Sequence, residues 1–157
     1  GLDLMEPSGS AGPDGVPRLA EGLFAGSLPA VTVLSLERMH VGDAGASGIA
    51  AALDRGALPR LKHLDLADAA IGDAALVALA PALRRRPALK SLCLNGNPFG
   101  NYEGLAALVA PQLAADAPPP TTGVLTELSH LDLECTQITD AGCATLAAAL
   151  DSGALPA

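Results

Sequence analysis

Residues 61–83, LKHLDLADAAIGDAALVALAPAL, contain two hydrophobic patterns that follow one another. Leu61, Leu64 and Leu66 have the spacing of a short extended segment, in which successive side chains point to opposite faces. The apolar residues after them have the spacing of an amphipathic helix. These are Ile71, Leu76, Leu79 and Leu83. Neither half can bury its apolar side alone, so this unit needs neighbours of the same kind.

The same pattern returns at other places along the chain. It begins again at Val31, at Leu89 and at Leu128, and the long interval before Leu128 indicates an insertion. A less regular unit precedes them, with Leu2 and Leu4 in its extended segment. Self-similarity of this kind is the signature of a repeat architecture. We therefore expect one domain over residues 1–157, with units at about 1–30, 31–60, 61–88, 89–127 and 128–157 and an insertion at 114–127.

The pattern L-x-x-L-x-L-x-x-x-x-(I/V/F), followed by a helix, resembles the leucine-rich repeat. The period of roughly 28 residues is similar to that of the ribonuclease-inhibitor-like subclass. The resemblance implies an α/β fold, a right-handed solenoid in a horseshoe arc. It also implies a parallel β-sheet on the concave face and α-helices on the convex face, in about five repeats. Ran GTPase-activating proteins and NOD-like receptors carry repeat arrays that this chain also resembles.

The composition of the chain excludes some classes of binding partner. The chain has 157 residues, 50% of them hydrophobic but only 2% aromatic, so the core must be built from Leu, Ala and Val. Its net charge of -8 argues against nucleic acid, which is bound mainly through Lys and Arg. No apolar run reaches the length of a membrane span, and no secretory leader is recognisable, so we expect no membrane partner.

Cysteine usage and the chain ends suggest where the protein works. Cys93, Cys135 and Cys143 are an odd number without framework spacing, which favours free thiols in a reducing compartment, the cytoplasm or the nucleus. The chain opens on Gly1 within a repeat pattern, and it closes on GALPA, which elsewhere precedes a new unit. We therefore expect a fragment of a longer array whose native N-terminus is missing.

Four polar residues stand where helices are expected to begin: Asp43, Asp73, Asn101 and Asp140. We predict that each is an N-cap, accepting a hydrogen bond from an unpaired helix N–H. In GALPR, residues 56–60, glycine is expected to end the preceding helix in a left-handed conformation. Cys143 occupies the position of Leu76, which predicts a small side chain in the core.

Other positions depart from the resemblance. In leucine-rich repeats an Asn or Cys commonly follows the last strand leucine by three residues and bonds to the backbone of the turn. Here that position holds Met39, Ala69, Asn97 and Thr136. We expect incomplete turn hydrogen bonds at Met39 and Ala69. Pro81 and Pro111 predict kinks or short helices, and the arginines at 84–86 predict a solvated helix end.

The third, fifth, seventh and eighth positions of each unit should lie on the concave face, because the leucines between them face inward. From these positions, and from the turn at Tyr102, we choose the candidate partner-binding residues. They are Glu37, Asp65, Asp68, Cys93, Asn95, Tyr102, Asp132 and Glu134, with Asp3, Met5 and Glu6 extending the face in the first unit. Most are acidic, and Arg38 is the one cation expected among them, so the predicted partner is a protein with a basic patch.

Cys93 carries a second hypothesis. Asp65 and Asp132 should flank it on adjacent strands, at about 4.8 Å to each side, with His63 and His130 in the neighbouring column. Cys, His and Asp can form a zinc site or activate a thiol. Flanking carboxylates raise a thiol pKa, however, and an open sheet excludes little water. Solvated surface is therefore favoured, with a metal or thiol site around Cys93 as the alternative.

The leading hypothesis is a non-catalytic protein–protein interaction scaffold, without a cofactor. The family resemblance implies the alternative of a regulatory module, similar to those of Ran GTPase-activating proteins or NOD-like receptors. Pro118, Pro119 and Pro120 are interpreted as part of a plain insertion, with a docking site as the other possibility.

Overall fold

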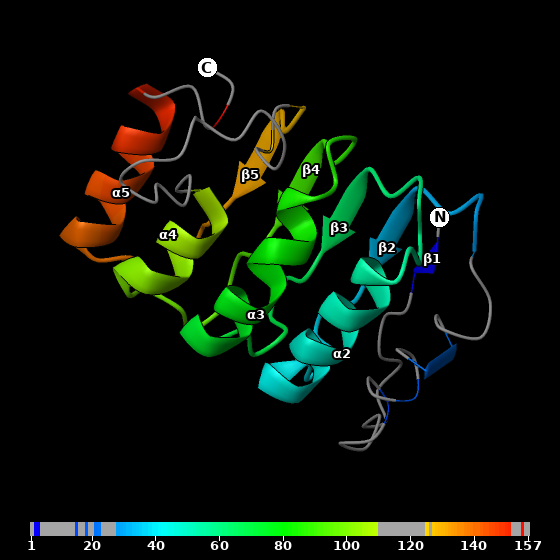
Figure 1. Ribbon diagram of the computed structural model, residues 1–157. Helices are drawn as coiled ribbons and strands as arrows, with labels where there is room; N and C mark the ends of the chain where they lie inside the picture. The colour runs from blue at the N-terminus through cyan, green and yellow to red at the C-terminus, as the bar shows by residue number, and fades with distance from the viewer. Residues whose placement is uncertain are drawn as a thin grey trace.

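The protein is built from strand–helix units placed side by side (Figure 1). This computed structural model describes residues 2–3, 15, 18, 21–22, 28–109, 125, 127–151 and 155, without the side chains of Leu2, Asp3 and Tyr102. The strands are β1 (Leu2–Asp3), β2 (Val33–Ser35), β3 (His63–Asp65), β4 (Ser91–Cys93) and β5 (His130–Asp132). The helices are α2 (Gly42–Asp54), α3 (Asp73–Arg84), α4 (Tyr102–Val109) and α5 (Asp140–Asp151).

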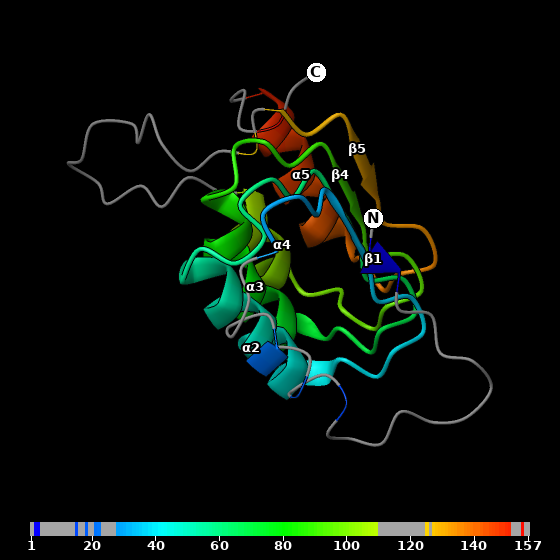
Figure 2. The ribbon, with the colours of Figure 1, turned by 90° about the vertical axis from the view of Figure 1, so that its right-hand side faces the viewer.

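The strands form one parallel sheet in chain order, β1-β2-β3-β4-β5. Helices α2 to α5 form a second layer on one side of this sheet, and no labelled helix lies on its other side (Figures 1 and 2). We call that other side the sheet face. Among the described elements, each helix lies beside the next helix in the chain and each strand pairs with the next strand, as expected for a solenoid. The expected α/β arrangement is confirmed.

The leucine spacing sets the register of the sheet. Leu34, Leu64, Leu92 and Leu131 are direct neighbours across β2 to β5. The first three are at most 1% exposed, and the strand leucines that follow them, Leu36, Leu66 and Leu94, are fully buried. Since a one-residue slip would turn every one of these side chains outward, their burial specifies the pairing. Leu, Ala and Val supply most of the core, with Phe99 as its largest buried side chain.

Helix α2 ends as the sequence predicts. Gly56 has φ +91°, and its N–H donates to the Leu53 carbonyl at 2.9 Å. The next residue, Ala57, donates to the Ala52 carbonyl at 3.0 Å. This pair of bonds around a left-handed glycine is the Schellman motif. It turns the chain out of the helix toward β3.

The N-cap prediction is wrong for three of its four residues, Asp43, Asp73 and Asp140. Val41 is the N-cap of α2, so Asp43 lies inside the first turn. Gly72 is the N-cap of α3, where no side chain caps the helix. Asp73 instead accepts hydrogen bonds through Oδ1 from the N–H groups of Gly100 (3.3 Å) and Asn101 (3.0 Å) in the following unit. The carboxylate therefore joins two units.

Asp140 is the first residue of α5, and the Cys143 N–H donates to the Thr139 carbonyl, so Thr139 stands at the N-cap position. Asn101 directly precedes α4, at the position of an N-cap. Pro81 lies inside α3, which runs on to Arg84, so of the expected kink or short helix the short helix does not occur there. Pro111 lies outside the described residues.

The prediction for Cys143 is also wrong. The side chain is exposed, although Leu76 at the same position of α3 is fully buried. Leu76 is covered by α4, where a Cβ on Gly104 would stand 3.2 Å from a Leu76 methyl group. In the described part of the chain no helix packs on the outer side of α5. Cys143 is exposed because no described helix covers this side of α5.

Asn97 holds two units together. It is 1% exposed, and its Nδ2 donates to the carbonyls of Leu66 (2.7 Å), Leu94 (2.9 Å) and Asn95 (3.1 Å). Its Oδ1 accepts from the N–H groups of Ala69 (3.1 Å) and Ile71 (2.9 Å). The turn at Ala69, which was expected to lack hydrogen bonds, is thus completed by the next unit.

Candidate interaction surface

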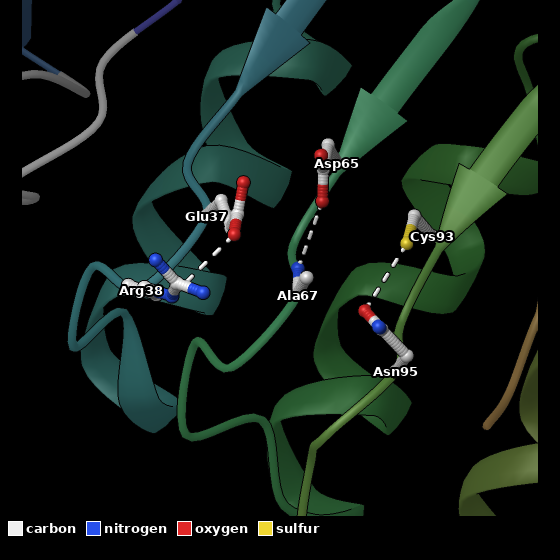
Figure 3. A network of polar contacts seen from close by, with 6 residues as sticks. All are labelled: Glu37, Arg38, Asp65, Ala67, Cys93 and Asn95. Atoms are coloured by element: carbon white, nitrogen blue, oxygen red, sulfur yellow. Dashed lines mark hydrogen bonds and ion pairs between the residues drawn. The ribbon is translucent and has the colours of Figure 1, made fainter. Parts of the chain in front are cut away.

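The register places candidate residues side by side on the sheet face. Ser35 pairs with Asp65, Asp65 with Cys93, and Cys93 with Asp132. We call these four residues the central row. A parallel row, Val33, His63, Ser91 and His130, runs beside it toward the strand starts. Figure 3 shows Asp65 and Cys93 on the side of the sheet away from the helices. The predicted juxtaposition of Asp65, Cys93 and Asp132 is therefore present.

Both carboxylates of the central row are fixed by their own turns. Asp65 Oδ1 accepts a hydrogen bond from the Ala67 N–H at 3.0 Å (Figure 3), and Asp132 Oδ1 accepts one from the Glu134 N–H at 3.0 Å. Each is a local bond between residues two apart, of the kind that Asp forms where a strand ends. Both residues are half-buried.

Cys93 lies between them in a surrounding that keeps its thiol protonated. Its Sγ–H contacts Asn95 Oδ1 at 3.2 Å (Figure 3) and Asp132 Oδ2 at 3.6 Å. Burial is the largest cause that raises the pKa of Cys93, to about 11, and the negative charges of Asp65 and Asp132 act in the same direction. A hydrogen bond with the backbone of Asn95 lowers this pKa without outweighing them. Since the thiolate is the nucleophile, this environment opposes thiol chemistry.

The two histidines considered as metal ligands lie apart in the sheet. His63 and His130 both flank Ser91, on opposite sides, so two strand spacings of about 4.8 Å lie between them. Both imidazoles are exposed. Across the described ranges, no three His, Cys, Asp or Glu side chains come together in a group that suits a metal ion.

A column of left-handed residues follows the strands, and sequence analysis missed it. Arg38 (φ 58°), Asp68 (φ 50°), Gly96 (φ 68°) and Cys135 (φ 53°) occupy the same position in four successive units. A Cβ on Gly96 would stand 2.1 Å from Asp68 Oδ1, so the Asp68 carboxylate lies over the glycine. Gly96 is the strongest sequence signal of such a conformation and Asp68 a weaker one, whereas Arg38 and Cys135 carry none.

Acidic and basic side chains lie at opposite ends of the strands. The charged side chains at and just after the strand ends are mostly acidic: Glu37, Asp65, Asp68, Asp132 and Glu134. Arg38 follows β2 with φ 58°, and its Nε lies 3.5 Å from Glu37 Oε1 (Figure 3). Lys62 and Lys90 are exposed immediately before β3 and β4. Two basic side chains therefore stand at the strand starts, and the list of candidate residues did not include them.

The three arginines at 84–86 connect neighbouring units on the helical side of the protein. Arg85 Nη1 pairs with Asp54 Oδ1 at 2.7 Å, and Arg84 Nη1 donates to the Ala107 carbonyl at 3.3 Å. Arg86 donates to the carbonyls of Leu53 and Leu58, at the end of the preceding unit. Burial lowers the pKa of Arg86, and the charge of Asp54 opposes that shift. Two of these guanidinium groups thus cap carbonyls of neighbouring units, which the prediction of a solvated helix end did not include.

Several candidate binding residues lie outside the described part of the chain. They are Met5, Glu6, residues 118–120 and the side chains of Asp3 and Tyr102. The three cysteines are all free thiols, and Cys135 is exposed beside β5, as predicted for the edge of the sheet. None of the described helices combines the length and the apolar character that crossing a membrane requires.

The fold and the open sheet define a solenoid of parallel strand–helix units. Residues 58–80 and 124–147 match the family model described as "Leucine Rich repeat". The chain is similar to a solved structure of "Leiomodin-1 Actin-Binding Site 2 (ABS2)", at 18% identity and a TM-score of 0.54, over 94% of this chain and 91% of that one. Comparison with curated proteins finds no match. These findings support a leucine-rich repeat protein, and its fold is the α/β leucine-rich repeat solenoid.

Proposed function

We propose that the chain is a non-catalytic protein-interaction module whose sheet face binds a basic surface of a partner protein. The central row carries this proposal. Asp65 and Asp132 stand on either side of Cys93 in neighbouring strands, and each carboxylate is held by a backbone N–H. A surface already in its bound geometry loses little side-chain entropy on association.

The distribution of charge orients the partner. Asp68 and Glu134 are exposed beyond the carboxylates of the central row, whereas Lys62 and Lys90 stand at the opposite edge. Complementary potentials guide encounter and discriminate against wrong partners. A basic patch should therefore lie over the ends of β3 to β5, away from the strand starts.

The chemistry at Cys93 supports binding in preference to catalysis. A nucleophilic cysteine needs a lowered pKa and a base in contact, as a Cys–His pair provides. Here the pKa of Cys93 is raised to about 11, and the two groups that its thiol contacts are an amide and a carboxylate. The similar leiomodin structure is that of an actin-binding site of leiomodin-1, which also fits a binding role.

The experiment is affinity capture from the source cell with three baits. One bait is the wild type, and the second carries Asp65→Lys and Asp132→Lys. The third carries Glu103→Lys and Asp151→Lys, which makes the same change of net charge at two exposed positions of α4 and α5. We expect the first and third baits to recover the same basic partner, with binding that weakens as salt rises. Equal recovery by the second bait would move the binding site off the sheet face.

A further variant distinguishes the effect of the two charges from the effect of their hydrogen bonds. Asp65→Asn with Asp132→Asn keeps an oxygen that can accept from the Ala67 and Glu134 N–H groups but removes both charges. If the carboxylates act through their charge, this variant should bind more weakly with an unchanged circular dichroism spectrum.

Two finer assignments complete the proposal. We place the chain in the ribonuclease-inhibitor-like subclass, because its units repeat at roughly 28 residues and α2, α3 and α5 are full helices. A regulatory role on a GTPase would need free side chains at the rim between strand and helix. Asn97 and Asp73 at this rim are already bonded to backbone of adjacent units, which favours the scaffold.

A further inference from the structure

The sequence contains two lysines, and both stand at the same position of neighbouring units. Lys62 directly precedes β3 and Lys90 directly precedes β4. The Lys90 N–H donates to the Lys62 carbonyl at 2.7 Å, so the two residues are neighbours across the sheet. Both are exposed. Two ammonium groups therefore extend into solvent from adjacent backbone positions.

The backbone links this pair to a hydroxyl-bearing residue on each side. The Lys62 N–H donates to the Thr32 carbonyl at 2.8 Å, and the Ser129 N–H donates to the Lys90 carbonyl at 2.9 Å. We call Thr32, Lys62, Lys90 and Ser129 the lysine row. It crosses the strand starts one residue before the parallel row that contains the two histidines.

The lysine pair has no counter-charge within the described part of the chain. The ion pairs found there join Arg38 to Glu37 and Arg85 to Asp54. Like charges directly opposite each other on neighbouring strands destabilise a sheet. Although the protein has a net charge of -8, these two cations are left without a carboxylate. An anion bound from outside would reduce their repulsion.

The residues next to the lysines can donate hydrogen bonds to the same anion. His63 follows Lys62 and pairs with Ser91, which follows Lys90 and pairs with His130. Both histidines are exposed, and Ser91 is half-buried. Imidazole and hydroxyl groups each supply a donor beside the two ammonium groups. The strand starts thus offer cations and donors, whereas the strand ends offer carboxylates.

Charged residues just before the lysine row make its β3 side the more positive one. Arg60 and Glu127 occupy the same position of their units, two residues before Lys62 and Ser129, and both are exposed. A third cation therefore precedes β3, whereas an acidic residue precedes β5. An anion should bind over the starts of β3 and β4, because the positive charge is concentrated there.

We infer that the lysine row binds a carboxylate of the same partner protein whose basic patch meets the central row. This inference rests on the proposed function and adds the pattern of charge that the partner carries. Lys62 and Asp65 are three residues apart, which is about 10 Å of extended strand. The partner surface should therefore hold an acidic side chain about 10 Å from its basic ones. A partner with basic groups at both places would set one against the lysines and bind more weakly.

A free anion fits the lysine row less well than a carboxylate of a bound partner. Both lysines are exposed, and an ion pair at an exposed site contributes little on its own. The net charge of -8 also repels small anions from the protein. A carboxylate on a partner that already contacts the central row arrives at a high effective concentration.

The test uses three synthetic peptides with blocked ends, titrated against the chain at low salt and followed by nuclear magnetic resonance. The first is Glu-Glu-Gly-Ser-Arg-Arg, the second has Gln in place of both Glu, and the third has Gln in place of both Arg. We expect the first to bind about two- to fivefold more tightly than the second, the range for exposed ion pairs, and the third to bind most weakly. General attraction to an acidic protein predicts the opposite order for the first two, because the second peptide has the larger positive charge.

Three protein variants assign the effect to the lysine row. Lys62→Gln with Lys90→Gln should reverse the order, so that the second peptide binds more tightly than the first. Lys62→Arg with Lys90→Arg retains both charges and should keep the wild-type order. Ala44→Glu with Val77→Glu should keep it too, because it makes the same change of net charge as the Gln variant at exposed positions of α2 and α3.

Three outcomes would overturn the inference. The first is tighter binding of the second peptide than of the first to the wild type, and the second is an unchanged order in the Lys62→Gln, Lys90→Gln variant. The third is saturable binding of inorganic phosphate alone, with chemical-shift changes at the Lys62 and Lys90 amides, which would make a free phosphate the occupant.

The second peptide separates this inference from the proposed function. If it binds with chemical-shift changes around Asp65 and Asp132, the proposed function stands even where the acidic end of the first peptide adds nothing. If neither of the two arginine peptides binds, the proposed function and the inference that rests on it both fail.

Discussion

Replacing Asn97 by Ala should destabilise the protein more than most other single side-chain truncations. The amide makes five hydrogen bonds to backbone groups, in its own unit and the preceding one. Its loss leaves the N–H groups of Ala69 and Ile71, two residues that are 0% exposed, without an acceptor. At about 1–3 kcal/mol for each stranded buried donor, the expected loss is about 2–6 kcal/mol, against a total of about 5–15 kcal/mol for a typical domain.

The assay is urea unfolding followed by circular dichroism, with native-state hydrogen exchange as a second readout. Thr136→Ala is the matched control, because Thr136 holds the same position in a later unit and makes one hydrogen bond, from Oγ1 to the Leu133 carbonyl at 2.7 Å. It should cost about 1 kcal/mol. In exchange, the amides of Ala69 and Ile71 should lose protection selectively. A loss below about 1 kcal/mol for Asn97→Ala, or equal losses for the two variants, would refute the reasoning.

Other substitutions test the packing and the thiols. Leu83→Ala removes a fully buried side chain and should cost about 2–5 kcal/mol. Leu150→Ala, at the same position in α5 but 50% exposed, should cost less than about 1 kcal/mol. Similar losses in urea unfolding would show that the Leu150 side chain is covered as that of Leu83 is. Gly100→Ala places a Cβ 1.9 Å from the Gln137 carbonyl oxygen, so backbone must shift, and we expect a loss of about 1–3 kcal/mol, visible as a lower melting temperature. Because the pKa of Cys93 is raised to about 11 from an ordinary 9.0, its thiolate fraction at pH 8 falls roughly a hundredfold. Alkylation followed by mass spectrometry should therefore label Cys93 more slowly than exposed Cys135, with a rate that still rises above pH 9; equal rates at pH 8 would contradict the assigned environment.

The leucine spacing predicted most of the fold because it determines which neighbours pair. A strand has one register that turns Leu64, Leu92 and Leu131 inward together, and that register also places Asp65, Cys93 and Asp132 side by side. The main row of the candidate surface was therefore accessible from the sequence.

The errors arose where a residue's partner lies in another unit. Periodicity indicates which side of a helix faces inward, but it does not indicate whether a following helix covers that side, and Cys143 is exposed for this reason. Asp73 has the side chain of an N-cap, yet its acceptor oxygen is used by backbone 27 and 28 residues away. Left-handed backbone at Arg38 and Cys135 has no sequence signal, because neither residue type favours it.

The claim that the sheet face is the binding surface is tested most directly by nuclear magnetic resonance of the complex with the captured basic partner. We predict that the largest chemical-shift changes fall at the ends of β3 to β5, around Asp65, Cys93 and Asp132, and that helices α2 and α3 change little. Adding salt should reverse the changes together. Shifts confined to the helical layer, with the central row unchanged, would contradict the account.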